Sequence, residues 1–196
     1  AWLRGLVASG VVKKVVTAAR VGAVGIQIGN TEDWMHDTQV TGAVGREATV
    51  FLIGAAAMMG MVEVTHSEGY DVCDERTAGA KVRPAYRSLE LLMAHVDGFE
   101  AAEVVEGLGP GVWATRFVHA DRETMVLWRE DDVLQLPGEG EVGVEVAVPV
   151  SASQVRVTQV VTAVSAPLPV PEVVEVGDGT VTLTLTSTPV FVELLP

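Results

Sequence analysis

The hydrophobic pattern of this chain changes at the glycine-rich segment Gly107-Leu-Gly-Pro-Gly111. Before this segment, apolar residues recur at three- and four-residue spacing or gather in short runs, which is typical of helices alternating with strands. After it, short stretches rich in Val and Thr are separated by turn signals, which is typical of β-strands. We therefore predict an α/β segment over residues 1–107 and an all-β segment over residues 108–196.

The first segment is expected to contain three helices and two strands. Residues such as Leu3, Leu6 and Val7 follow helical spacing, and Pro84 stands where helix starts favour proline. The predicted helices are 2–20, 44–60 and 84–96, and the predicted buried strands are 23–28 and 61–66. The polar stretches 31–41 (with at most one helical turn) and 67–83 are expected to be loops.

Helices alternating with strands in this way imply parallel strands joined by crossover helices. A parallel sheet needs cover on both faces, and two strands are too few to form a stable one. The α/β segment is therefore expected to be incomplete by itself.

The second segment is predicted to be an antiparallel β-sandwich. Residues 180–186 alternate strictly, with Val181, Leu183 and Leu185 on the inner face, and the turn Gly177-Asp178-Gly179 precedes them. The predicted strands are 112–120, 124–129, 142–150, 154–161, 170–176, 180–186 and 189–195.

The charge of the chain bears on its partners. It carries 26 acidic and 13 basic residues, a net charge of −13. Such a field repels nucleic acid and anionic membrane surfaces, so we expect neither as a partner.

The apolar stretch 50–61 is too short to span a bilayer. Cys73 is the single cysteine and cannot form an internal disulfide. Cysteine content therefore does not indicate the cellular compartment of the protein.

Three short motifs follow one another along the chain: Thr31-Glu32, Val82-Arg-Pro-Ala-Tyr-Arg-Ser-Leu89 and Met125-Val-Leu-Trp128. In this order they resemble the C-terminal end of (β/α)8-barrel glycoside hydrolases. In many of those enzymes the seventh strand ends in Thr-Glu, a segment similar to the second motif follows the eighth strand, and a small β-sandwich comes last. The resemblance implies that the α/β segment is the end of a barrel.

The same resemblance implies a retaining mechanism with Glu32 as the nucleophile. A closed barrel takes about 250 residues, and the acid/base glutamate of the family has no counterpart in this chain. Retaining hydrolysis needs two carboxylates about 5–5.5 Å apart. The chain, which begins at Ala1, is therefore expected to be a fragment or one part of a split enzyme, and inactive alone.

The remaining site candidates lie in loops that would open at the same mouth as Glu32. Trp34 would either stack on a sugar ring or pack as a lid. If Glu32 is not the nucleophile, it is simply an acidic side chain in a solvated loop. His66, Glu68 and Tyr70 come at the end of the second predicted strand and are candidate carbohydrate contacts, against ordinary loop polarity.

No metal or cofactor is expected. The acidic, histidine and cysteine side chains of the loops match no zinc spacing; they are His36, Asp37, His66, Glu68, Asp71, Cys73 and Asp74. The glycines of residues 107–111 precede a strand, which excludes a phosphate loop. Trp113 and Trp128 are expected to pack in the sandwich core, with an exposed sugar-binding platform as the alternative.

Two other functions remain open. The sandwich could be a non-catalytic module that binds carbohydrate or serves as a rigid accessory domain. Alternatively, the α/β segment could complete its sheet on a partner chain or a second copy.

Overall fold

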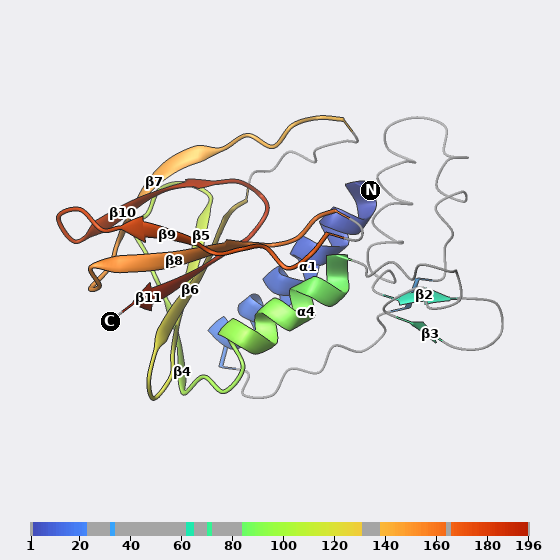
Figure 1. Cartoon of the computed structure of the whole chain (residues 1–196), viewed down its shortest axis with the longest axis horizontal. Coiled ribbons are helices and arrows are strands. Elements are labelled where there is room, and N and C mark those ends of the chain that lie inside the picture. The colour runs from blue at the N-terminus through green and yellow to red at the C-terminus, as the bar shows by residue number, and fades with distance from the viewer. Residues whose placement is uncertain are drawn as a thin grey trace.

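The computed structural model describes residues 2–22, 32–33, 62–64, 70–71, 84–130, 138–163 and 166–195. Among these residues, two helices lie beside a set of antiparallel strands (Figure 1), and three short strands form a separate sheet. The helices are α1 (Trp2–Arg20) and α4 (Pro84–His95), and the short strands are β1 (Glu32–Asp33), β2 (Val62–Val64) and β3 (Tyr70–Asp71). In the part of the chain that is described, no helix is long and apolar enough to cross a membrane.

A six-stranded antiparallel sheet forms the centre of the molecule. Its strand order is β4-β5-β6-β11-β8-β9. The strands are β4 (Ala101–Val104), β5 (Val112–Val118), β6 (Glu123–Arg129), β8 (Gln154–Gln159), β9 (Glu172–Glu175) and β11 (Val190–Leu195). Strand β11 pairs with both β6 and β8, so that the end of the chain lies in the middle of the sheet.

A two-stranded ribbon covers one face of this sheet. It consists of β7 (Val144–Pro149) and β10 (Thr180–Leu185), paired antiparallel. Burial alternates along β10, with Val181, Leu183 and Leu185 inside and the threonines outside. These side chains share a core with Leu127 and Val192 of the sheet. The predicted antiparallel β-sandwich is therefore confirmed.

The two helices cover the opposite face of the same sheet. Val12 and Val16 of α1 and Leu92 of α4 belong to a second core, together with Phe117 and Phe191 of the sheet. The helices also contact one another, because the buried Ser88 hydroxyl donates to the carbonyl oxygen of Ala8 at 2.9 Å. The described chain thus has three layers: helices, six-stranded sheet and ribbon.

Helix α1 has its predicted bounds, and α4 begins at the predicted Pro84 and ends one residue earlier than predicted. Proline opens α4 at Pro84, where its missing N–H costs nothing. Gly22 follows α1 with φ of 86° and Gly98 follows α4 with φ of 78°. This left-handed conformation ends a helix and is easily adopted by glycine.

Several expectations about the first segment need correction. Glu32–Asp33 and Tyr70–Asp71, expected in loops, are short strands. Strand β1 pairs parallel with β2, as expected for this segment, but β3 pairs antiparallel. Within the described residues these strands form a three-stranded mixed sheet, and the predicted strand 23–28 and helix 44–60 lie outside them.

The sheet also begins earlier in the chain than we expected. Strand β4 was not predicted, yet it pairs with β5 along four residues, from Ala101 opposite Val118 to Val104 opposite Thr115. It lies before the division that we placed between residues 107 and 108. That division stays a prediction, and the helices and the sheet share one buried core across it.

Candidate functional site

The main chains of two predicted site residues lie on either side of β2. Glu32 of β1 is opposite Val62, and Tyr70 of β3 is opposite Val64. Since neighbouring strands lie about 4.8 Å apart, the two outer strands are about 10 Å apart. Trp34, His66 and Glu68 fall outside the described residues. The role of Glu32 and its proximity to these side chains stay predictions.

Among the residues that the structure describes, no group of three or more His, Cys, Asp or Glu side chains could hold a metal ion. Of the loop residues considered from the sequence, the described ranges include Asp71, in β3.

Trp113 and Trp128 stack on one another across neighbouring strands. Their ring centroids are 5.7 Å apart and the ring planes meet at 15°. Trp128 is 2% exposed, so the predicted core packing is confirmed for it. The predicted core packing is wrong for Trp113, which is 37% exposed, and the guanidinium of Arg20 lies 4.4 Å from its ring centroid. Because an indole and a guanidinium already occupy this ring, Trp113 does not offer an open platform for a sugar.

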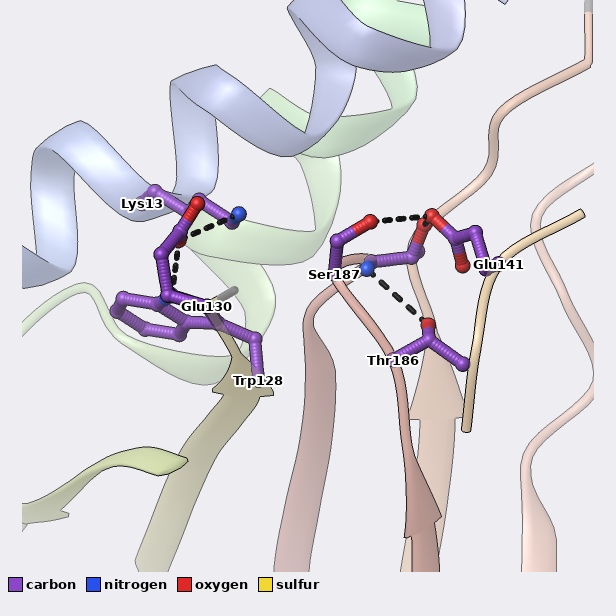
Figure 2. Close-up of polar contacts among 7 residues, drawn as sticks. Lys13, Trp128, Glu130, Glu141, Thr186 and Ser187 are labelled. Atoms are coloured by element: carbon purple, nitrogen blue, oxygen red, sulfur yellow. Dashed lines mark hydrogen bonds and ion pairs between the residues drawn. The ribbon is translucent and has the colours of Figure 1, made fainter. Parts of the chain in front are cut away.

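The buried indole is also tied to helix α1 by one carboxylate (Figure 2). Trp128 Nε1 donates to Oε2 of Glu130 at 2.9 Å, and Lys13 Nζ binds the same oxygen at 2.8 Å. The Glu130 side chain is 50% exposed. Water therefore screens this ion pair, and we expect it to contribute less than about 1 kcal/mol. It links α1 to the sheet, whereas the buried core holds the helix in place.

A second carboxylate, Glu141, is held by hydroxyl groups near the same end of the sheet (Figure 2). The hydroxyls of Ser187 and Thr188 both donate to Oε1 of Glu141, each at 2.7 Å. The connection between β10 and β11 is itself ordered, because the backbone N–H of Thr188 donates to Oγ1 of Thr186 at 3.1 Å. This segment thus presents three hydroxyl side chains in a row to one carboxylate.

The environment of Glu141 keeps it ionised. Partial burial raises the pKa of Glu141, but hydrogen bonds from the hydroxyls of residues 186–188 and the charge of Lys13 outweigh that effect. Its pKa therefore lies below the usual glutamate value. At neutral pH the site therefore holds a negative charge, with neutral hydroxyls around it and the positive charge of Lys13 nearby.

A hollow of about 180 Å³ opens beside this carboxylate. Its polar lining consists of Glu141, Gln159, Thr162, Thr184, Thr186 and Thr188. Val160 and Val190 supply an apolar part and are each 5% exposed. Helix α1 borders the region, because Gly5 contacts Thr162. Four threonines, one glutamine and one glutamate therefore line a single small space.

Sequence reasoning did not find this hollow. Glu141 is 46 residues from Ser187 and 47 from Thr188. The hydroxyl run at residues 186–188 was visible in the sequence, but nothing in it indicated which carboxylate would lie against it.

Comparison with known proteins gives distant structural neighbours. No protein-family model matches the chain, and no curated protein matches its sequence. The structure is similar to a GH30 endoxylanase from Clostridium papyrosolvens C71, with a TM-score of 0.41 and 11% identity over 59% of this chain and 28% of that one. It is also similar to a family 39 glycoside hydrolase from the gut symbiont Bacteroides cellulosilyticus WH2, with a TM-score of 0.37 and 14% identity over 58% of this chain and 20% of that one.

The matched regions span less than a third of either neighbour's chain. TM-scores below 0.5 do not establish a shared fold, so neither neighbour assigns an activity to this protein.

Proposed function

We propose that this chain is the C-terminal portion of a retaining glycoside hydrolase, with Glu32 as the nucleophile. The observation that carries the proposal is the order of motifs and elements. Glu32, the second residue of the Thr31-Glu32 motif, begins β1, which pairs parallel with β2; the helix that starts at Pro84 follows, and the β-sandwich comes after it. This order is the one that the resemblance to barrel glycoside hydrolases implies.

The proposed chemistry needs a second carboxylate. In a retaining mechanism one carboxylate attacks the anomeric carbon, while a second acid protonates the leaving oxygen and later activates water. The resemblance gives this chain the nucleophile alone. We therefore propose that the 196-residue chain does not hydrolyse glycosides until another polypeptide segment supplies the acid/base group.

The test compares two forms of the protein on the same substrates. Hydrolysis of a panel of aryl glycosides and polysaccharides would be measured with the natural product purified from its source, whose intact mass is determined, and with the 196-residue chain. We expect turnover from a longer natural polypeptide or a natural complex, with retained anomeric configuration, and none from the chain alone.

Glu32→Gln in the active form is the second test. It should lower kcat by on the order of 10³-fold or more, since it removes the attacking oxygen. Asp33→Asn, one residue along β1, is the matched control and should retain most activity. Equal losses in the two variants, or inverted product configuration, would refute the assignment of Glu32. A natural product of 196 residues that is monomeric would refute the hydrolase proposal itself.

A rigid accessory module is the second candidate, and one observation favours it. The helices and the six-stranded sheet share one buried core, which includes Val16, Val96 and Phe191. Such a unit is suited to holding a neighbouring domain in a fixed orientation. If the module binds carbohydrate, binding to glycans would show it. If the β1-β2-β3 sheet instead extends onto a partner chain or a second copy, the protein would form an oligomer whose population depends on concentration.

A further inference from the structure

The hollow beside Glu141 is lined by polar side chains and takes no part in the proposed hydrolysis. We propose that it binds one ring of a neutral polyhydroxylated ligand of monosaccharide size. This inference does not depend on the proposed catalytic role of Glu32, because every residue in it belongs to the sandwich or its connections.

The lining suits vicinal hydroxyl groups. A hydroxyl ligand both donates and accepts, so it needs partners of both kinds. The hydroxyls of Thr186 and Thr188 donate to Glu141 and so offer acceptor positions, whereas Thr162, Thr184 and the amide of Gln159 can supply both donors and acceptors. Glu141 adds an ionised acceptor, and hydrogen bonds to a charged group are about twice as strong as neutral ones.

The apolar part of the hollow suits the C–H groups of a sugar ring. Val160 and Val190 lie together at the ends of β8 and β11, because the backbone N–H of Val160 donates to the carbonyl oxygen of Pro189 at 3.2 Å. Small-molecule sites combine such apolar surface with a few placed polar groups. The hollow has both within one lining.

Its size limits the ligand to one ring. The hollow of about 180 Å³ is smaller than the ~300–1,000 Å³ of pockets for drug-sized ligands. A cavity of about 150 Å³ accommodates a benzene ring. Because a pyranose has more heavy atoms than benzene, one edge of a single ring would enter the hollow, and the rest of the ring and any further sugar units would stay in solvent.

Ions are poorer occupants than a neutral polyol. The negative charge of Glu141 and the chain's net charge of −13 oppose an anion. Calcium prefers six to eight oxygen ligands, often from several carboxylates. Here one carboxylate lines the hollow, Oε1 already accepts two hydrogen bonds, and Lys13 is near enough for its charge to lower the pKa of Glu141.

The test is a titration of the isotope-labelled 196-residue chain followed by amide chemical shifts. The probes are D-glucose, D-galactose, D-mannose and D-xylose, each as the free sugar and as its methyl glycoside, with short oligosaccharides as a third arm. We expect shifts confined to residues 141, 159–162 and 184–188, with a Kd in the millimolar range. Stronger binding of the methyl glycosides would show that the ligand is the terminal sugar of a glycan chain. Stronger binding of the free sugars would show that it is a free monosaccharide.

Variants connect the shifts to the hollow. Glu141→Gln keeps the shape of the side chain and should weaken binding about tenfold. Glu172→Gln, an exposed residue on β9, makes the same charge change and should leave the Kd unaltered. Thr184→Val should also weaken binding, whereas Thr182→Val, on the same strand but outside the hollow, should not.

Three outcomes would overturn the proposal. They are the absence of shifts with every sugar, shifts that Glu141→Gln leaves unchanged, and shifts that calcium chloride or sodium chloride reproduces. None of these outcomes bears on hydrolysis, which depends on Glu32. Conversely, loss of the hydrolase proposal would leave this binding experiment unaffected.

Discussion

Gly5 of helix α1 lies directly against Thr162. A Cβ atom on residue 5 would stand 2.9 Å from the Cβ of Thr162 and 3.2 Å from its carbonyl oxygen. Helix α1 can therefore approach the segment after β8 only because residue 5 has no side chain. Since Thr162 also lines the hollow beside Glu141, this contact joins the helical layer to the proposed binding site.

Gly5→Ala should accordingly destabilise the protein. We expect a loss of about 1–3 kcal/mol in the free energy of unfolding, as for other overpacked sites. Gly10→Ala in the same helix is the matched control, because a Cβ on residue 10 would meet no atom within 4 Å. That change should stabilise by about 0.5–1 kcal/mol. Urea unfolding measures both, and equal effects would show that the contact with Thr162 is unimportant.

Gly111 should tolerate substitution less well than Gly107. Both glycines have positive φ, 72° and 81°, so alanine at either position costs about 1–2 kcal/mol of backbone strain. At Gly111 a Cβ would also meet the carbonyl oxygen of Glu130 at a forbidden distance, whereas the space at Gly107 is open. Thermal unfolding should therefore rank Gly111→Ala well below Gly107→Ala. The reverse order would contradict the close approach of residues 111 and 130.

His95 should make the protein less stable in mild acid. It stacks on Phe191 with centroids 5.0 Å apart. Burial lowers the pKa of His95; Glu193 opposes that effect, and Arg122 and Arg156 add to it. The unfolded state therefore takes up the proton first, and stability is complete above pH ~6.5 and falls as the pH drops through the folded-state pKa.

His95→Phe tests this expectation, since it keeps an aromatic ring against Phe191 and removes the proton site. The free energy of unfolding would be measured for both proteins between about pH 5 and pH 7.5, the range in which histidine titrates. The difference between them should change across this range in favour of the variant at low pH. A difference that is independent of pH would exclude His95 as the source.

Glu141 should stabilise the folded protein more at neutral pH than in acid, whereas a carboxylate whose pKa burial alone raises would do the reverse. Its folded-state pKa is lowered from the ordinary value of 4.5, so its contribution is complete above that pH and is lost as the pH falls through the lowered pKa. Glu141→Gln should reduce stability near neutrality by less than about 1 kcal/mol, because water screens the exposed carboxylate. Chemical unfolding at several pH values should show the difference vanishing in acid. A persistent difference would point to altered packing instead of lost charge.

Local patterns in the sequence determined most of the secondary structure. Helices α1 and α4 follow apolar spacing that a helix brings to one face, and Pro84 marks the start of α4. The alternation of residues 180–186 fixed both the strand and its inner face. The candidate site was predictable in part: the resemblance singled out Glu32, but neither its strand nor the pairing of Tyr70 with Val64 could be obtained from polar loop composition.

Tertiary structure decided which surfaces met. The sequence showed that α1 has an apolar face, but not that it would pack on the sheet face opposite the ribbon, or that Lys13 would reach Glu130, 117 residues away. Likewise, Glu141 meets the hydroxyls of residues 187 and 188 only because β7 and β10 pair and β11 enters the middle of the sheet. Periodicity reports which side of an element is buried, whereas the partner it is buried against depends on contacts between distant segments that no local pattern encodes.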